Sequence, residues 1–278
     1  MDLSVAARTD VGRIRAGNED SLYAEADQER GLFIVADGMG GHAAGEVASE
    51  MAVQIVSREL LEVRDPTADD AAPRMVSAIH VANRSIWERT ITEAEKHGMG
   101  TTASALLLGH GRYLIGHVGD SRIYRLREGR LEQLTKDHSY VQEQVDAGFL
   151  TPDQARVHPY SNVITRCIGA NERVEPDILT GELVPGDIFL IASDGLTGML
   201  EDTHLLRYLG ASTTPGRKVD GMISEANRRG GLDNITAIVI HVRGVEGVGA
   251  VRTGEHPSFG PTGEFTRFGR TDEHKTVN

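Results

Sequence analysis

The sequence has almost no cysteine and no long hydrophobic run. Cys167 is the only cysteine, so an internal disulfide and a cysteine-rich zinc site are both excluded. No stretch approaches the roughly 18 uncharged apolar residues that a membrane span needs. The first residues, MDLSVAARTDVGR, include acids and lack the apolar core of a signal peptide. We therefore expect a cytoplasmic protein.

The sequence also lacks an excess of basic residues. It has 41 Asp and Glu against 29 Lys and Arg, which gives a formal net charge of −12. This balance argues against nucleic acid and anionic membranes as partners. Residues 243–278 contain equal numbers of acids and bases, so the excess charge belongs to residues 1–242. The final stretch is rich in Gly, Thr and Pro without apolar periodicity, and we predict a folded domain over 1–242 followed by a flexible tail.

Apolar runs alternate irregularly with helical patterns. Strands with buried faces are predicted at 32–37, 103–109, 113–120, 187–194 and 235–242. Helices are predicted at about 45–64, 72–96 and 214–229. This order does not form regular βαβ units, and it indicates an α+β protein in which helices cover sheets.

Four aspartates lie where the predicted strands begin or end. Asp37, Asp120 and Asp194 follow apolar runs beside a small residue, and Asp233 precedes ITAIVIHV. Carboxylates gathered at one edge of a sheet repel one another and need compensation. Oxygen ligands suit Mg²⁺ or Mn²⁺. Aspartate-glycine is also an ordinary turn dipeptide, so each position alone favours a turn, whereas the four together favour a metal site.

Other catalytic motifs are missing. The glycine-rich segment DGMGGHAAGE lacks the Lys-Ser/Thr of a nucleotide-binding Walker loop and the acid of a dinucleotide-binding fingerprint. No G-x-S-x-G sequence is present, and no base lies near Cys167 in the sequence. A serine or cysteine nucleophile is therefore unsupported.

Taken in order, the motifs resemble the bacterial branch of the metal-dependent protein phosphatases of type 2C, the PPM family. The matching segments are GRIRAGNEDS (12–21), ADGMGGHAAGE (36–46), GMGTT (98–102), VGDSRIY (118–124), LTKDHS (134–139), NVITRCIG (162–169), ASDGL (192–196) and DNIT (233–236). Any one of them is weak evidence, but together they cover residues 12–242 almost continuously.

The resemblance implies a particular fold. It is a four-layer α-β-β-α sandwich, in which two antiparallel β-sheets pack face to face between helix pairs. Residues 1–242 then form the catalytic domain. Residues 139–160, which read as helix, turn and helix, correspond to the mobile flap subdomain beside the active site in the resembling enzymes.

The resemblance also implies two Mn²⁺ or Mg²⁺ ions that share a water. Asp37 would bridge both ions, and the carbonyl of Gly38 would bind one of them. Asp194 and Asp233 would hold the other. Asp120 together with Asp194 matches the third, weaker site of bacterial members.

Three acidic or basic residues of the first motif complete the implied site. Glu19 and Asp20 would orient metal-bound waters. Arg15 is the candidate for binding the phosphate, because a guanidinium contacts two phosphate oxygens at once. Arg13 is the alternative, and a structural role in which Arg15 only pairs with Glu19 or Asp20 also stays open.

The resemblance gives no general acid. Animal members have a histidine at the position of Met39, and a thioether cannot donate a proton. His42 or a metal-bound water could serve instead.

The implied activity is hydrolysis of phosphoserine and phosphothreonine in proteins, without a covalent phosphoenzyme. The expected partners are phosphoproteins and a cognate Ser/Thr kinase, and we expect a monomer. Alternatives are a phosphatase for small regulators of sigma factors, an inactive phosphoprotein-binding regulator, and a metal-dependent nuclease. The ligand aspartates argue against the inactive regulator, and the acidic charge argues against the nuclease.

Overall fold

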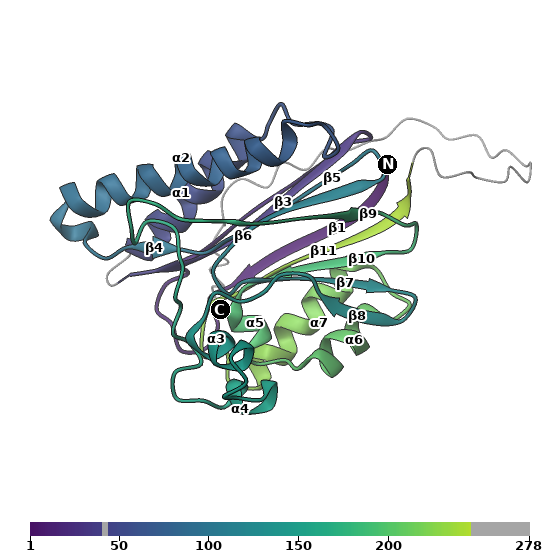
Figure 1. The fold of residues 1–278 in the computed structure, drawn as a ribbon. Coiled ribbons are helices and arrows are strands. Elements are labelled where there is room, and N and C mark those ends of the chain that lie inside the picture. Colours follow the sequence, from purple (N-terminus) through teal and green to yellow (C-terminus); the bar gives the residue numbers. More distant parts are fainter. Residues whose placement is uncertain (41–43, 246–278) are drawn as a thin grey trace, which may run out of the picture.

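Two antiparallel β-sheets lie face to face and form the centre of the protein (Figure 1). The structure is a computed structural model, and it describes residues 1–40 and 44–245. The first sheet has the order β1 (Asp2–Asp10), β11 (Ile235–Gly244), β10 (Ile188–Ala192), β7 (Arg122–Arg127) and β8 (Arg130–Gln133). The second has the order β2 (Asp20–Ala26), β3 (Arg30–Met39), β5 (Ala103–Gly109), β6 (Arg112–Val118) and β9 (Asp177–Glu182), and the short β4 (Gly100–Thr101) pairs with β3.

Both faces of the central strands are buried, which explains their unbroken apolar sequences. In β3, Leu32 and Ile34 pack toward helices, whereas Phe33 and Val35 pack into the space between the sheets. Side chains alternate in this way because successive residues of a strand point to opposite faces. Three apolar cores result, one between the sheets and one outside each sheet.

Helices cover the outer face of each sheet. The second sheet is covered by α1 (Ala44–Glu59) and α2 (Ala71–Thr92), and the short η1 (Ala94–Lys96) follows them. The first sheet is covered by α6 (Asp202–Leu209) and α7 (Pro215–Arg228), with α5 (Asp194–Thr197) directly after β10. Figure 1 shows the two groups of helices on opposite sides of the paired sheets. The prediction of an α+β protein with two antiparallel sheets is confirmed, and the arrangement agrees with the expected four layers.

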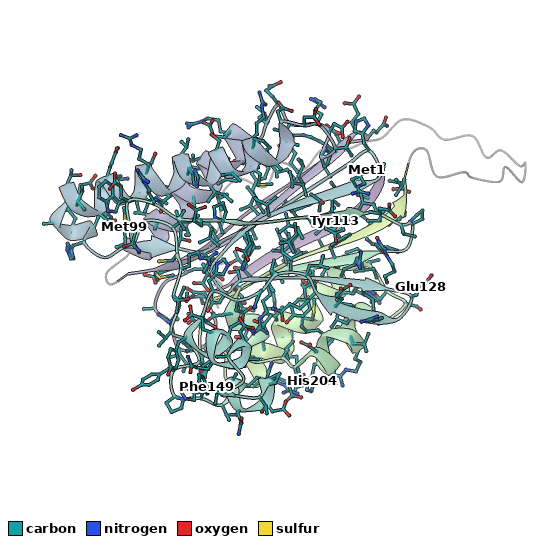
Figure 2. The ribbon with its side chains drawn as sticks, in the orientation of Figure 1. Met1, Met99, Tyr113, Glu128, Phe149 and His204 are labelled. Carbon is teal, nitrogen blue, oxygen red and sulfur yellow. The ribbon has the colours of Figure 1, made fainter. Side chains whose placement is uncertain are left out.

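The predicted flap forms two short helices, α3 (Tyr140–Asp146) and α4 (Pro152–Arg156). Gly148 has a φ of 75° in the turn between them, a conformation that glycine adopts without strain. Thr151 caps α4 in a capping box with Gln154. Phe149 is 76% exposed at the outer end of this unit (Figure 2).

The predicted domain boundary lies close to the end of the last strand. β11 continues to Gly244, two residues beyond the expected limit at 242. Most of the predicted tail, residues 246–278, lies outside the described residues. Within the described ranges, no helix is both long and apolar enough to cross a membrane.

Candidate active site

Five aspartates from both sheets meet at one end of the strands. Asp37 lies near the end of β3, and Asp20 on β2 is its direct cross-strand partner. Asp120 and Asp194 each lie two residues beyond a strand, after β6 and β10, and Asp233 lies two residues before β11. The strand-end pattern in the sequence therefore corresponds to a convergence in space.

The electrostatic environment of these carboxyls is unfavourable to their charge. Loss of contact with water is the largest cause that raises the pKa of Asp37 well above its usual range, and the neighbouring Asp20, Asp194 and Asp120 raise it further. Burial likewise raises the pKa of Asp20 to about 7, although hydrogen bonds from Ser193 and Thr236 oppose the shift. The pKa values of Asp120 and Asp194 are also raised, by burial first and then by neighbouring carboxylates. Such a cluster favours protons or cations over free charge.

Asp37 lies on β3 and Asp194 lies just after β10 of the opposite sheet, and each carboxyl influences the pKa of the other. The main chain of Asp37 is fixed by two threonines: Thr102 Oγ1 accepts from its N–H at 2.9 Å, and Thr101 Oγ1 donates to its carbonyl at 2.9 Å. The side chain of Asp37 is therefore presented from a rigid strand.

Glycine is required after both of these aspartates because the chain is crowded there. A Cβ on Gly38 would lie 2.2 Å from the carbonyl oxygen of Gly45. A Cβ on Gly195 would lie 1.9 Å from the carbonyl oxygen of Asn234. The Asp-Gly pairs thus allow α1 and the loop before β11 to approach the carboxylates.

A serine network joins the two sheets behind the site. Ser193 Oγ donates to Asp20 Oδ2 at 2.8 Å and accepts from the backbone N–H of Thr236 at 3.0 Å. This arrangement fixes Asp20 against β10 and β11. The sequence analysis did not single out Ser193, and its only sequence signal is its place directly before Asp194.

Arg15 reaches the site, and its partner is Asp233. Its Nη2 donates to Asp233 Oδ2 at 2.6 Å. The alternative in which Arg15 pairs with Glu19 or Asp20 is absent from the ion pairs of the described residues, although Glu19 is close enough to influence Arg15 electrostatically. Arg13 instead uses its main chain, with its N–H donating to the carbonyl of Gly231 at 2.7 Å. The guanidinium of Arg15 is thereby joined to an aspartate of the site.

Asn234 holds the loop that carries Arg15 and Glu19. Its Oδ1 accepts from the N–H of Glu19 at 2.8 Å, and its Nδ2 donates to the carbonyls of Val11 and Gly17 at 2.9 Å each. Glu19 lies against the first turn of α1, where a Cβ on Gly45 would be 2.8 Å from its carboxyl carbon. Burial is the main cause that raises the pKa of Glu19. Sequence reasoning did not assign a role to Asn234, which only the Asp-Asn pair of DNIT could have indicated.

Asp120 is nearly inaccessible, with 6% of its surface exposed. The turn before it is tight: Gly119 has a φ of 108°, and a Cβ there would lie 2.5 Å from Thr102 Cγ2. His138 closes the turn with two hydrogen bonds. Its ring Nδ1 accepts from the backbone N–H of Gly119 at 3.0 Å, and its backbone N–H donates to the carbonyl of Gly119. The base of the flap is thereby joined to the loop of Asp120.

The donor set fits divalent cations that prefer oxygen, although the side chains are not arranged as a finished site. Over residues 1–40 and 44–245, no three His, Cys, Asp or Glu side chains are grouped as a ready metal cluster. Two carboxylate oxygens, Asp20 Oδ1 and Asp120 Oδ1, are buried without a hydrogen-bond partner. Asp233 is turned toward Arg15 and toward the N–H of Asn234. Metal binding would satisfy such oxygens.

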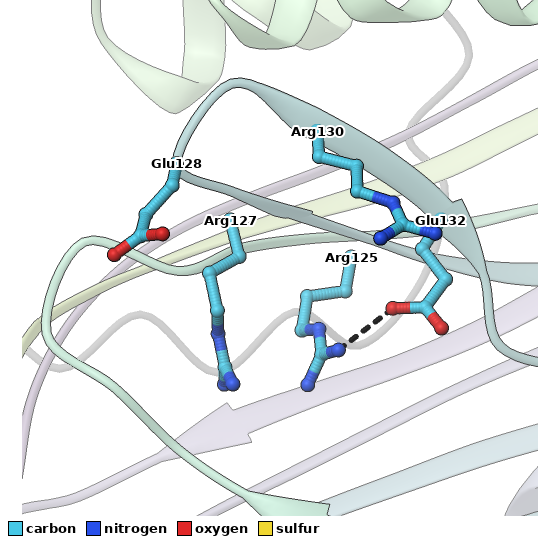
Figure 3. Close-up of a pocket in the computed structure, with 5 residues that line it drawn as sticks. All are labelled: Arg125, Arg127, Glu128, Arg130 and Glu132. Carbon is cyan, nitrogen blue, oxygen red and sulfur yellow. Dashed lines mark hydrogen bonds and ion pairs between the residues drawn. The ribbon is translucent and has the colours of Figure 1, made fainter.

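Two cavities of about 410 Å³ each have different surroundings. One is lined by the Arg15–Glu19 loop, Glu46 and Asn234, and so adjoins the aspartates. The other lies on the hairpin of β7 and β8, where Arg125 pairs with Glu132 (Figure 3). Arg127 also lines it and pairs with Asp187. The second cavity is at the far end of β7 from Asp120, and it is therefore separate from the candidate site.

Comparison with protein families finds one match that covers most of the chain. Residues 13–224 match the model described as protein phosphatase 2C. A putative protein phosphatase 2C-type of Streptococcus pyogenes is 39% identical over 241 residues, which are 86% of this chain and 97% of that protein. The serine/threonine protein phosphatase PstP of Mycobacterium tuberculosis is 40% identical over 240 residues, but these are only 45% of its length.

Solved structures that resemble this chain are also serine/threonine phosphatases. The serine/threonine phosphatase of S. agalactiae has a TM-score of 0.81 and 38% identity, covering 87% of this chain and 100% of that one. The catalytic domain of PstP, in complex with two manganese ions, has a TM-score of 0.76 and 38% identity, covering 86% and 97%. The similarity therefore includes a protein whose structure contains two divalent ions.

Proposed function

The chain belongs to the protein phosphatase 2C family, and from this membership we propose that it hydrolyses phosphoserine and phosphothreonine in proteins with the help of Mn²⁺ or Mg²⁺. The observation that carries the proposal is the convergence of Asp20, Asp37, Asp120 and Asp194, whose pKa values are all raised. Buried carboxyls that repel one another form a site for cations of high charge.

The proposed ligands are those that the family resemblance implies. Asp37 is central, since Asp20, Asp120 and Asp194 all influence its charge, and it would contact two ions. The Gly38 carbonyl would bind one ion, and Asp194 and Asp233 would hold the other. Asp120, with its unpartnered Oδ1, would hold a third ion together with Asp194.

The ions, when bound, supply a shared water of lowered pKa and compensate the charge of the phosphate. Glu19 and Asp20 would accept hydrogen bonds from waters in the site and so orient them. Arg15 would exchange its contact with Asp233 for two oxygens of the phosphate. The water oxygen forms a bond to phosphorus, the bond from phosphorus to the Ser or Thr oxygen breaks, and the leaving oxygen takes a proton.

The source of that proton is proposed to be a water, because Met39 cannot donate one. The other candidate from the sequence, His42, lies outside the described residues. The proposed substrates are proteins phosphorylated by a Ser/Thr kinase of the same cell, in keeping with the activity named for the relatives. We propose that the enzyme acts as a monomer.

The test is release of phosphate from a phosphothreonine peptide, with and without Mn²⁺, by the wild type and by Asp37→Asn. The matched control is Asp220→Asn, which alters an exposed aspartate paired with Arg8. Manganese-dependent release by the wild type and the control, lost in Asp37→Asn, is the expected result. Equal release by all three proteins, or none from folded wild type at millimolar Mn²⁺, would contradict the proposal.

A further inference from the structure

Two large apolar side chains are exposed on the loops that carry Arg15 and Asp233. Ile14 is 68% exposed and Leu232 is 57% exposed. Single exposed apolar residues are common on protein surfaces and need no explanation. These two differ because they come from opposite ends of the described chain, and both are next in sequence to a residue of the site.

The two loops that carry them are held together by their main chains. The N–H of Arg13 donates to the carbonyl of Gly231 at 2.7 Å. A Cβ on Gly12 would lie 2.2 Å from the carbonyl oxygen of Asp233, so the loops are in contact with no space for a side chain between them. We call Ile14 and Leu232, carried on these joined loops, the apolar lip.

Each lip residue is next in the chain to a residue of the proposed site. Ile14 precedes Arg15 and Leu232 precedes Asp233, and the side chains of Arg15 and Asp233 are in contact at 2.6 Å. Consecutive Cα atoms are about 3.8 Å apart, so the main chain of each lip residue lies one residue away from that of Arg15 or Asp233. A substrate that presents its phosphate to Arg15 therefore brings its neighbouring residues near the loops that carry the lip.

We propose that the apolar lip binds an apolar side chain one or two residues from the phosphorylated Ser or Thr, and so selects protein substrates with an apolar residue there over those with an acidic one. This inference rests on the proposed function. An apolar substrate side chain would remove the exposed surface of Ile14 and Leu232 from water. An acidic side chain would lose hydration against the lip and would gain no hydrogen bond from it.

The experiment compares kcat/KM for phosphothreonine peptides that carry either Leu or Asp on both sides of the phosphorylated residue. We expect the wild type to prefer the Leu peptide by about tenfold, the scale of discrimination by a small apolar contact. In Ile14→Ser and Leu232→Ser this ratio should fall, and in the double variant it should approach one. Because the ratio is taken within each protein, a change in overall rate cancels.

Two further variants test whether the preference depends on the apolar character of the lip. Leu61→Ser changes an apolar residue that is 45% exposed just beyond the far end of α1, about 24 Å along a 16-residue helix from the site, and should keep the wild-type ratio. Ile14→Asn with Leu232→Asn keeps the number of side-chain heavy atoms and should lower the ratio as the serine variants do.

Hydrolysis of p-nitrophenyl phosphate with Mn²⁺, a substrate without a peptide chain, tests the proposed function alone. Ester hydrolysis by a wild type that shows no peptide preference, or a preference that survives the double variant, would overturn the role of the lip and leave the phosphatase in place. A wild type that hydrolyses neither ester nor peptide would overturn both.

Discussion

The two ends of strand β10 carry aspartates in opposite surroundings. Asp187 directly precedes the strand and is fully buried as a side chain, and both of its oxygens accept hydrogen bonds at 2.6 Å from the guanidinium of Arg127. Asp194 follows the other end, where it meets Asp37 and the charge of Asp233. One strand thus lies between a matched carboxylate, which is paired with an arginine, and an unmatched one, which faces other carboxylates.

This difference separates a structural from a functional use of the same residue type. A matched pair such as Asp187 and Arg127 loses stability when one partner is removed, because a buried charge is left alone. A cluster of carboxylates without basic partners, such as that around Asp194, reduces the stability of the metal-free protein, and clusters of this kind are typical of functional sites. Substitutions at the two ends should therefore have opposite effects.

The largest effect is expected for Asp194→Asn. Loss of a proposed ligand should lower kcat/KM on a phosphothreonine peptide by at least about 10³-fold, since several kcal/mol of transition-state stabilisation depend on the ions. In EDTA the same variant should unfold at a higher urea concentration than the wild type. Its free energy of unfolding should be larger by roughly 1 kcal/mol, because one repelling charge is gone. If Asp194→Asn is inactive and also less stable than the wild type without metal, the proposed contrast between Asp194 and Asp187 at the two ends of β10 is wrong.

The next effect concerns the pH dependence of the metal-free protein. Burial raises the pKa of Asp20 to about 7, so the folded state binds a proton more tightly than the unfolded state does. The stability associated with this proton is fully present below about pH 4 and is lost as the pH rises through 7. A shift of this size corresponds to roughly 4 kcal/mol.

The test is urea unfolding of the wild type and of Asp20→Asn in EDTA at pH 4.5, 6 and 7.5. The variant should gain stability over the wild type progressively as the pH increases, and excess Mn²⁺ should reduce the difference. A difference that stays constant over this range would show that the carboxyl of Asp20 is not held protonated by its surroundings.

A smaller effect is expected for Asp187→Asn. The substitution keeps the shape of the side chain but removes the charge that meets Arg127, and the N–H of Val184 also donates to this carboxylate at 2.9 Å. Removal of one partner of a buried pair costs 3–5 kcal/mol. Because Arg127 is 28% exposed, we expect about 2 kcal/mol of lost stability in urea unfolding. Activity on a phosphothreonine peptide should stay within about threefold of the wild type, and a larger loss would mean that the two ends are coupled.

The sequence predicted the central strands and the positions of the aspartates better than the edges of the sheets. Runs such as LFIVA are recognisable because both of their faces are buried. The edge strand β1, DLSVAARTD, is only partly buried along its length, and the sequence analysis assigned no strand there. Edge strands mix polar and apolar residues, so their pairing is decided by contacts with distant segments.

The same limit applies to the site. The strand-end pattern of the sequence indicated Asp37, Asp120, Asp194 and Asp233 as candidates, and the structure has them at one end of the sheets. The contact of Arg15 with Asp233, and the bonds from Asn234 that hold the Arg15 loop, join residues more than 200 positions apart. No periodicity or turn signal reports such a pairing, because it depends on how the two ends of the chain meet in the folded sheet.

The smallest effect is expected for Glu132→Gln at the hairpin end of the same sheet. Glu132 accepts a hydrogen bond from Arg125 at 2.7 Å, but it is 46% exposed, so water screens the pair and we expect at most about 0.5 kcal/mol of lost stability. Compared with Asp187→Asn, this variant tests whether burial of the carboxylate decides the effect, since both partners are arginines of β7. Equal losses in urea unfolding for the two variants would mean that the arginine contact alone sets the stability, and the contrast between matched and unmatched aspartates would then need a cause other than burial.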